Sequence, residues 1–455
     1  MSKSVLIIGG GIAGIEAALN LADYDFQVYL VDDSPTIGGL MARLDKTLPT
    51  NDCSICIEAP KMYDVQKHPN IQLLTNCEVR RVEGDEGLFK VRVLKKPRFI
   101  DEEKCKGCGK CSEVCPISVP DELDNKIGGK RKLIYIPFPQ AVPNYYLIHP
   151  DCRYGKKKEE GACVGGCIID CIQCRECPIA LCVKACKEDG ADAVMLWQRE
   201  QLLDLEVNSI IVATGIESFE PPIGLYGYGN YDNVITNLQF ERLMNAGGPT
   251  QGEIVRPSDG AHAKRIAWVQ CVGREKRGDK AEPLPYCSKV CCMIATKQAI
   301  VTLEHEADVK GYILHNHLQT YGKGFYEFYR RAKELGIEYL KGKPSDVFED
   351  PKTKNIKIRF ENLDKGEVED LEIDLLVLST GFTPGKRNKR LSKILKIGLD
   401  ENGFIKEKDA VNAPFETNIE GIYVCGGATG PIDISESVSQ AIGASMKAVL
   451  SKGSR

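Results

Sequence analysis

The sequence predicts an α/β protein with two dinucleotide-binding-type domains and a cysteine-rich insertion. Two segments, residues 4–22 and 265–303, each start with a short apolar run and continue through a turn into helical apolar spacing. Strand–turn–helix units of this kind build parallel sheets. Between them, residues 105–186 contain twelve of the 20 cysteines. A dinucleotide-binding domain does not need such a density of thiols, so this segment is predicted to be a separate domain.

The composition is that of a globular protein, and it excludes several classes of function. A chain of 455 residues is long enough for about three domains with real cores. Its net charge of −4 does not favour nucleic acid or an anionic membrane surface. No apolar run approaches about 18 residues and no secretory signal precedes residue 4. We therefore expect no membrane span and a cytoplasmic location.

The first strand–turn–helix unit has the pattern of a phosphate-binding turn. Gly9, Gly11 and Gly14 match GxGxxG directly after the apolar run at residues 4–8. The first glycine allows the tight turn, the second lets a pyrophosphate approach the backbone, and the third lets the helix pack on its strand. A second strand ends at Asp32, about 20 residues further on, where an acid suits a ribose hydroxyl.

Four later segments favour a flavin over a nicotinamide as the bound dinucleotide. Residues 34–41 (SPTIGGLM) resemble the segment that lines the flavin in two-domain flavoproteins, and residues 209–215 and 375–381 are apolar strands ending in Thr-Gly turns. Residues 421–431 lead into a helix whose N-terminus would meet the flavin, although Gly427 stands where many families keep an aspartate. The predicted FAD-binding residues are Gly9, Gly11, Ile12, Ala13, Gly14, Asp32, Asp33, Gly38, Gly39, Leu40, Met41, Ala213, Thr214, Gly215, Thr380, Gly381, Gly426, Gly427, Asp433 and Ile434.

The insertion at residues 99–198 begins with a ferredoxin-type cysteine run. Cys105, Cys108, Cys111 and Cys115 follow the spacing C-x2-C-x2-C-x3-C-P, in which the fourth cysteine typically serves a neighbouring cluster. Disulfides belong mainly to small secreted chains, and zinc bound by four thiolates is the structural alternative. The spacing favours [4Fe-4S] clusters.

The second half of the insertion is irregular in its spacing. The twelve cysteines of the whole insertion could hold three cubanes, and we predict two. The predicted ligands in this half are Cys152, Cys171, Cys174, Cys177, Cys182 and Cys186.

Thiols replace glycines in the second strand–turn–helix unit. Cys271 ends the apolar run at residues 265–270, and Cys287, Cys291 and Cys292 come at the start of the next helical pattern. A nicotinamide site would need a second GxGxxG here. We therefore interpret the four thiols as ligands of an iron–sulfur cluster.

Three cysteines remain outside these patterns. Cys53 and Cys56 form a CxxC pair that could be a redox disulfide, half of a cluster site, or packing beside the flavin. A flavin-adjacent or partner-shared role is favoured. Cys77 lies in a strand-like run and is expected to be a core thiol.

Several of these motifs together resemble the A subunit of heterodisulfide reductase and its relatives in quinone-interacting and sulfur-oxidising complexes. They are NDCSICIEAPKM, KCKGCGKCSEVCP, IYIPFPQAVP, RPSDG, QCVG with YCSKVCCM, and GPIDISESVSQA. The resemblance implies a thioredoxin-reductase-like fold with FAD, and a cluster on Cys271, Cys287, Cys291 and Cys292. It also implies other subunits as partners, ferredoxin or another electron carrier, a homodimer as one option, and flavin-based bifurcation as a further activity.

The predicted function is electron transfer between FAD and at least three [4Fe-4S] clusters, with room for a fourth, in an oxidoreductase. The alternatives are an NAD(P)H-dependent disulfide reductase and a scaffold stapled by zinc. The predicted division has an FAD-binding domain in three parts: residues 1–98, residues 199–262, which are its return and a linker, and residues 373–455. The ferredoxin-like insertion takes residues 99–198, and a degenerate second Rossmann-like domain with cluster-binding cysteines takes residues 263–372.

Overall fold

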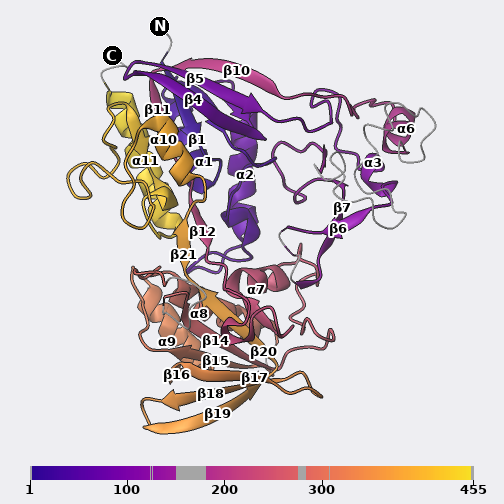
Figure 1. Cartoon of the computed structure of the whole chain (residues 1–455), viewed down its shortest axis with the longest axis vertical. Coiled ribbons are helices and arrows are strands. Elements are labelled where there is room, and N and C mark those ends of the chain that lie inside the picture. The colour runs from indigo at the N-terminus through magenta and orange to yellow at the C-terminus, as the bar shows by residue number, and fades with distance from the viewer. Residues whose placement is uncertain are drawn as a thin grey trace.

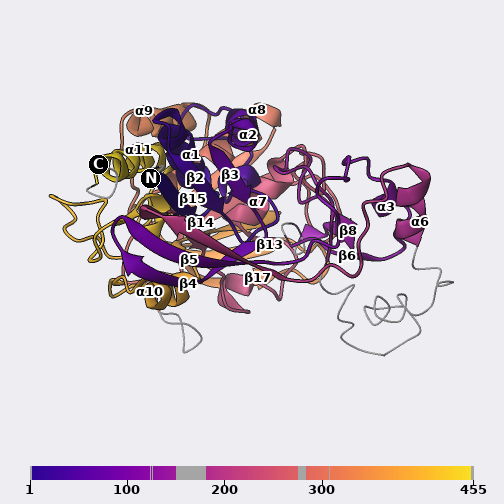
Figure 2. The same ribbon diagram turned by 90° about the horizontal axis from the view of Figure 1, so that it is seen from above.

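The computed structural model describes residues 3–122, 124, 127–149, 181–274, 283–306 and 308–451. Two α/β units are stacked along the long axis, and a smaller arm projects beside the first unit (Figure 1). Seen from above, the arm with α3 (Lys110–Glu113) and α6 (Leu181–Glu188) stands away from both units (Figure 2).

The first unit is built on a five-stranded parallel sheet with the strand order β22–β11–β1–β2–β3. The strands are β1 (Ser4–Ile8), β2 (Gln27–Val31), β3 (Ile71–Leu74), β11 (Ser209–Val212) and β22 (Ile422–Val424). Both faces are covered, which is why β1 is apolar almost throughout. Val5 and Ile7 pack in one core, while Leu6 and Ile8 point to the opposite one.

Helices cover one face of this sheet and a second, antiparallel sheet covers the other. The helices are α1 (Ile12–Asp23), α2 (Ser54–Lys67) and α11 (Ile434–Leu450). On the opposite face lie β4 (Cys77–Asp85), β5 (Leu88–Lys95), β10 (Gln201–Val207) and α10 (Asn388–Leu395). Short 3-10 turns η1 (Met41–Arg43) and η5 (Gly426–Ala428) follow the loops at the sheet edge.

The second unit repeats this plan. Its parallel sheet has the order β13–β20–β14–β15–β16. The strands are β13 (Val234–Thr236), β14 (Arg265–Val272), β15 (Lys310–His315), β16 (Glu338–Lys341) and β20 (Leu375–Thr380). One face carries α7 (Asn237–Met244), α8 (Cys291–His305) and α9 (Phe325–Glu334), and the other carries β17 (Pro344–Glu349), β18 (Ile356–Asn362) and β19 (Glu367–Ile373).

The chain crosses between the units through one antiparallel pair, β12 (Ile216–Ser218) with β21 (Phe382–Pro384). This crossing differs from the predicted division. The residues of β13 and α7 were expected in a linker and those of β20 in the flavin domain, yet all three elements belong to the second unit. An apolar strand fits either parallel sheet equally well, so the local sequence does not say which sheet it joins.

The described part of the arm is held by short elements around buried thiols. The remaining strands are β6 (Ser118–Pro120), β7 (Lys130–Lys132), β8 (Ile134–Tyr135) and β9 (Leu147–Ile148). Cys111, Cys115, Cys182 and Cys186 form part of its core with Phe99 and Ile134. Across the described ranges, no helix combines the length and apolar character needed to cross a bilayer.

Candidate functional site

The turn between β1 and α1 is packed so closely that only glycine fits at two of its positions. A Cβ on Gly14 would lie 1.8 Å from the carbonyl oxygen of Gly9, and one on Gly9 would lie 2.3 Å from that of Ala213. At Gly11, by contrast, the nearest atom would be 3.8 Å away. Gly11 is also the N-cap of α1 and brings no side chain to cap it. The first turn of α1 therefore has backbone N–H groups that no N-cap side chain engages, as a phosphate site requires.

Asp32 fastens this turn to the end of β2. Its carboxylate accepts the Gly10 N–H at 2.6 Å and the Ser34 N–H at 2.7 Å, one bond to each oxygen. Burial raises the pKa of Asp32, and the two backbone bonds act in the opposite direction. The residue was predicted to bind a ribose hydroxyl. In this structure both of its oxygens are already engaged by the backbone, so its first role is to clamp the turn.

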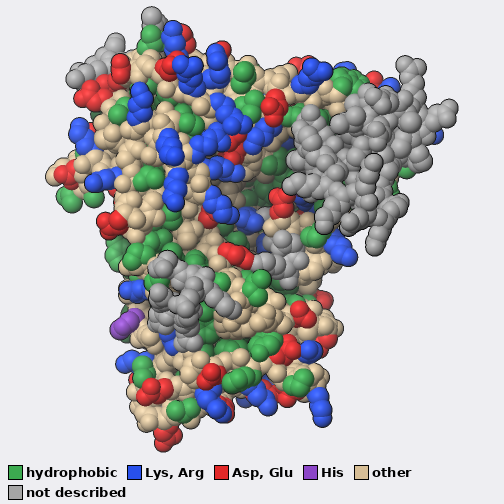
Figure 3. Space-filling model, in the orientation of Figure 1, with side chains coloured by type: hydrophobic (Ala, Val, Ile, Leu, Met, Phe, Trp, Pro, Cys, Tyr) green, Lys and Arg blue, Asp and Glu red, His purple; other side chains and the backbone are tan. Residues whose placement is uncertain are grey.

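A small cavity of about 80 Å³ lies beside this clamp, at the carboxyl ends of β1 and β2. Asp33, Thr214 and Arg387 line it, and Arg387 forms an ion pair with Asp33. Burial raises the pKa of Asp33, while Arg387 opposes that rise. On the side of the molecule drawn in Figure 3, lysine and arginine side chains are frequent over the upper half, which the first unit forms.

The Gly38–Gly39 turn packs directly on the glycine turn. The Gly38 N–H donates to the Gly10 carbonyl at 2.7 Å, and a Cβ on Gly39 would lie 2.9 Å from the Gly11 Cα. Leu40 and Met41 follow at η1, where Met41 is buried. Two segments that are far apart in the sequence thus form one surface.

The segment that leads into α11 also packs against the β1–α1 turn. A Cβ on Gly426 would lie 2.7 Å from the Cβ of Ala13, and one on Gly427 would lie 3.0 Å from Ile216 Cγ2. Asp433 caps α11, because its side chain accepts the Glu436 N–H at 2.7 Å while Glu436 accepts the Asp433 N–H at 3.0 Å. Ile434 is the first residue of that helix.

Two of the predicted flavin residues lie elsewhere. Thr380 ends β20 in the second unit, where its hydroxyl donates to Asn237 Oδ1 at 2.8 Å. A Cβ on Gly381 would lie 2.8 Å from Ser288 Oγ, in the cysteine segment. Gly215, with φ of +68°, ends the equivalent segment after β11 and stays with the first unit.

The arm brings together six of its predicted ligands, in one group around Cys111 and one around Cys182. The six are Cys105, Cys108, Cys111, Cys115, Cys182 and Cys186. Burial raises the pKa of Cys111 to about 12, and the neighbouring thiols of Cys186, Cys105, Cys182 and Cys108 act in the same direction. Burial raises the pKa of Cys182 to about 11, with Cys115 among its thiol neighbours. The predicted ligands that fall outside the described residues are Cys152, Cys171, Cys174 and Cys177.

The four thiols of the second unit meet at the carboxyl edge of its sheet. Cys271 stands near the end of β14 in a left-handed conformation (φ 59°), Cys287 precedes α8, and Cys291 and Cys292 begin it. The Cys291 thiol hydrogen-bonds to Cys292, which raises the pKa of Cys291 and lowers that of Cys292. Burial and the thiols of Cys271 and Cys287 raise the pKa of Cys291 further. Thiols that oppose one another's ionisation are suited to a positively charged metal centre.

The segment that carries these thiols is fastened to the first unit. Ser288 Oγ accepts the Phe382 N–H at 2.8 Å, and the Tyr286 hydroxyl donates to the Phe382 carbonyl at 2.9 Å. Lys289 Nζ lies 2.6 Å from Glu436 Oε1, in the first turn of α11. The four-thiol group is therefore linked to the helix whose N-terminus borders the glycine turn.

Two features of the interior were not found from the sequence. Glu58 on α2 is fully buried, and burial raises its pKa to about 9. Lys297 and Glu241 form a buried ion pair at 2.6 Å that reaches the first unit through Lys46. Cys53 and the exposed Cys56, by contrast, are joined by a disulfide, which was one of the three alternatives that their CxxC spacing left open. For Glu58 and for the Lys297–Glu241 pair, the available sequence signal was a charged residue at a helical position that faces the interior.

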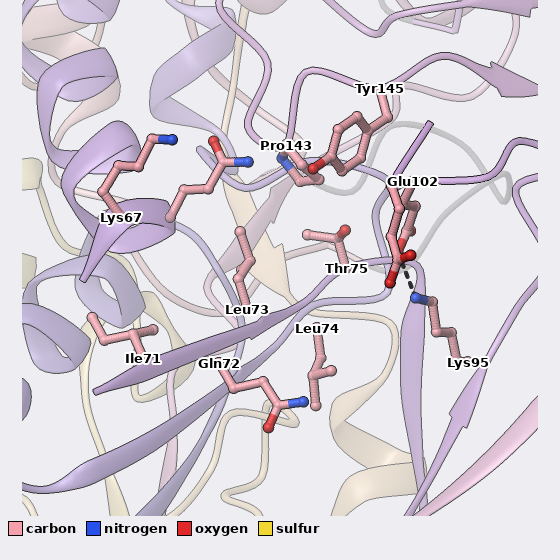
Figure 4. A pocket seen from close by; sticks show the side chains of 12 residues that line it. Lys67, Ile71, Gln72, Leu73, Leu74, Thr75, Lys95, Glu102, Pro143 and Tyr145 are labelled. Carbon is pink, nitrogen blue, oxygen red and sulfur yellow. Dashed lines mark hydrogen bonds and ion pairs between the residues drawn. The ribbon is translucent and has the colours of Figure 1, made fainter. Parts of the chain in front are cut away.

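A larger cleft of about 500 Å³ lies between α2, β3 and the arm. Lys67, Gln72 and Tyr145 line it, together with the Lys95–Glu102 ion pair at 2.6 Å (Figure 4). None of the residues predicted to bind a cofactor lines this cleft.

Within the described ranges, no three His, Cys, Asp or Glu side chains converge closely enough to hold a single metal ion. A structural zinc site needs its thiolates about 2.3 Å from one ion. A cubane is larger, so its thiolates stand further apart than those around one ion.

Comparison with known families matches this arrangement. The family described as pyridine nucleotide-disulphide oxidoreductase matches residues 3–98 and 293–448. The chain belongs to that family. A 4Fe-4S binding domain matches residues 98–121, within the arm. The α/β class with a ferredoxin-like insertion is confirmed, and the two matches support an FAD site and a [4Fe-4S] cluster in this oxidoreductase.

Curated relatives cover nearly the whole chain. It is 45% identical over 446 residues to the iron-sulfur A subunit of CoB–CoM heterodisulfide reductase from Methanocaldococcus jannaschii, covering 98% of this chain and 63% of the relative. It is 44% identical to the A subunit of the H2/formate:CoB-CoM heterodisulfide,ferredoxin reductase of Methanococcus maripaludis, covering 98% of this chain and 63% of that protein. The chain thus spans somewhat less than two thirds of each relative.

Among solved structures, the thioredoxin reductase of T. acidophilum aligns with a TM-score of 0.49 and 13% identity, covering 98% of each chain.

Proposed function

We propose that this protein is the flavin subunit of a heterodisulfide-reductase-like complex and passes electrons between FAD and [4Fe-4S] clusters. FAD exchanges one or two electrons and a cubane exchanges one, so together they convert two-electron chemistry into one-electron transfer. The observation that carries the proposal is the group of four thiols at the carboxyl edge of the second sheet. A nicotinamide-dependent enzyme would have its phosphate-binding turn at that edge.

The residues that would hold FAD are those around the β1–α1 turn. The glycine spacing of the turn and the N-terminus of α1, which no side chain caps, support a pyrophosphate there. The cavity beside Asp33 and Thr214 supports the adenosine half. The segment from Gly426 to Ile434 would border the flavin ring, because Gly426 already packs on Ala13 of the same turn. Thr380 and Gly381 would act at the join between the units.

The thiol groups support at least three clusters. Cys105, Cys108, Cys111 and Cys186 would hold the first, since Cys186 neighbours both Cys108 and Cys111. The second would use Cys115 and Cys182 with ligands from the remaining cysteines of the insertion. This exchange of a fourth ligand between halves is the ferredoxin pattern.

The third cluster would sit on Cys271, Cys287, Cys291 and Cys292 in the second unit. Lys289 and Ser288 would fix it relative to the flavin, through Glu436 and the backbone of β21. A fixed separation matters because one-electron transfer depends on distance.

The names of the relatives support the partners. One relative belongs to a heterodisulfide,ferredoxin reductase, so other subunits and ferredoxin or a similar carrier are proposed here as well. Bifurcation at the flavin and a homodimer within the complex belong to the same proposal. We further propose a flavin domain made of three parts of the chain, with β13, α7 and β20 assigned to the second unit.

The test is cofactor analysis of anaerobically purified protein. We expect one FAD and at least twelve iron and twelve acid-labile sulfur atoms per chain, on the basis of about four per cubane, with EPR signals on reduction. Zinc without sulfide would contradict the proposal and favour the scaffold. Rapid bleaching of the flavin by NADH in the isolated protein would instead favour the disulfide reductase alternative.

A further inference from the structure

The parallel sheet of the first unit has an open edge at β3. In the strand order β22–β11–β1–β2–β3, β3 pairs with β2 on one side and with no described strand on the other. Its sequence, IQLL over Ile71–Leu74, contains neither a charged residue nor a proline. Proteins commonly place such residues on edge strands to prevent further pairing. The edge of β3 is therefore able to accept another strand.

The register with β2 shows which backbone groups of β3 face away from the sheet. The Val28 N–H donates to the Asn70 carbonyl at 2.8 Å. The Asp32 N–H donates to the Leu74 carbonyl at 3.0 Å. Backbone groups alternate between the two edges of a parallel strand, so the even-numbered residues bond to β2. Leu73 thus directs its N–H and its C=O toward the open edge.

The cleft of about 500 Å³ between α2, β3 and the arm lies along this open edge. Every residue of β3 lines the cleft, and Leu73 stands in the middle of it in Figure 4. Lys67 of α2 borders the cleft near the start of the strand, and Glu102 and Tyr145 border it near the end of the strand (Figure 4). A space bounded in this way admits one extended chain, whereas another folded domain would meet the walls first.

The two ends of the cleft carry opposite charges. Lys67 is exposed at the end formed by α2. Glu103 is exposed at the end formed by the arm, where Glu102 is already paired with Lys95 at 2.6 Å. An extended peptide with an acidic side chain near Lys67 and a basic one near Glu103 would complement both ends.

We propose that β3 accepts an extended peptide segment of a partner protein as a sixth strand, which lies in this cleft. The Leu73 N–H donates to a carbonyl of the peptide, and the Leu73 carbonyl accepts an N–H from it. Strand addition of this kind takes its affinity from the backbone and its specificity from the side chains. The inference rests on the proposed function only in that a subunit of a larger complex has partners that supply such a segment.

The test uses the full chain purified alone and two synthetic peptide probes. One probe is acetyl-Glu-Thr-Val-Thr-Val-Lys-amide, and in the other the glutamate and the lysine are exchanged, so that the pair covers both strand directions. Threonine and valine favour an extended backbone. Calorimetry measures binding, and hydrogen exchange read by mass spectrometry follows the amides of residues 71–75.

We expect at least one probe to bind with a dissociation constant below about 1 mM and to slow exchange at residues 71–75 about tenfold. Leu73→Pro should weaken binding about tenfold, because it removes a donor that points away from β2 and leaves the bonds to β2 in place. Leu73→Ala is the matched control, since it shortens the same side chain but keeps the N–H. The midpoint of thermal unfolding checks that both variants fold.

Methylated probes make the test independent of any variant. N-methyl groups on the second and fourth residues of the probe block the N–H groups along one of its edges, and those on the third and fifth residues block the other edge. Only the edge that faces β3 matters, so one methylated probe should lose binding and the other should keep it. Loss of binding with both, or with neither, would show that β3 does not recognise the probe as a strand.

Two further results would overturn the proposal. Absence of binding by either probe up to about 1 mM would show that the cleft does not take an extended peptide. Slower exchange at residues 71–75 that depends on protein concentration, without a probe, would assign the edge to a second copy of this chain. Protein that lacks FAD and iron but binds a probe would fail only the electron-transfer proposal.

Discussion

The β1–α1 and β14–α8 junctions occupy the same position in their two parallel sheets but have opposite chemistry. In the first, glycines bring backbone against backbone: Gly9 packs on Ala213, Gly14 on Gly9, and Gly11 on Gly39. In the second, the junction is much longer and places Cys271, Cys291 and Cys292 at the corresponding edge. A short turn exposes N–H groups that suit a phosphate, whereas a long one brings side chains that suit a metal.

The helices that follow the two junctions also differ, because α1 buries mainly apolar residues and α8 buries polar ones as well. The buried face of α1 is made mainly of alanine, isoleucine and leucine, while α8 buries Thr296, Lys297 and Gln298. Lys297 pairs with Glu241, whose other oxygen accepts the Asp45 N–H at 3.0 Å from the first unit. The first helix packs on its own sheet, and the second also fixes the position of one unit relative to the other.

The largest effect is expected from filling the first turn. Gly14→Val should abolish FAD binding, because its Cβ would overlap the Gly9 carbonyl at 1.8 Å. FAD content per chain, measured by absorbance after release, gives the result. Gly398→Ala is the control, since its Cβ meets nothing closer than 3.7 Å. Full FAD content in Gly14→Val would show that the turn is not the dinucleotide site.

Removal of one thiol should affect only the second junction. Cys291→Ala should remove about four iron and four sulfide atoms per chain while FAD stays bound, since a cubane needs about four ligands. Metal analysis and the flavin spectrum of the same sample test both expectations. Cys425→Ala, a fully buried free thiol in the first core, should leave the iron content intact. Equal iron in both variants would contradict the ligand assignment.

Lys297→Met should destabilise the protein by about 3–5 kcal/mol, because Glu241 would keep an unpaired charge in the interior. The side chains of Lys297 and Glu241 are only 2% and 1% exposed. Denaturant unfolding measures the loss, and the double variant with Glu241→Gln should recover much of it. A double variant no more stable than Lys297→Met would show that the pair is not coupled.

Glu58 predicts a dependence of stability on pH. Its pKa is raised from 4.5 to about 9 by burial. The folded state holds a proton that the unfolded chain releases, so stability is full below pH 4.5 and falls as the pH rises toward about 9. The slope is at most about 1.4 kcal/mol per pH unit. Glu58→Gln should flatten it in unfolding experiments from about pH 5 to about pH 9; an unchanged slope would mean that Glu58 has a partner.

The smallest effect is expected from breaking the Lys289–Glu436 ion pair, which links the cysteine segment to α11. Glu436→Gln should reduce the free energy of unfolding by less than about 1 kcal/mol, because its ion pair with Lys289 is partly exposed. FAD and iron contents should not change. Lys386→Gln breaks the more exposed pair with Glu217 and should have no measurable effect. A larger loss in Glu436→Gln would assign it a role in holding the cysteine segment.

The sequence alone predicted both parallel units and the chemistry of each junction. Glycine spacing has a steric meaning that needs no distant contact, and cysteine spacing limits which thiols can share a cluster. The inserted arm and the family followed from the same local signals. The CxxC spacing marks Cys53 and Cys56 as a pair, but it does not decide among a redox disulfide, a shared cluster site and packing beside the flavin.

The tertiary structure decided what depends on residues far apart in the chain. It assigned β13 and β20 to the second sheet, paired Cys186 with the first cysteine run, and engaged both oxygens of Asp32. It also buried Glu58 and joined Lys297 to Glu241. Local spacing fixes which turn or ligand set a segment can form. The choice of sheet, ion-pair partner and degree of burial depends on which other segments pack against it.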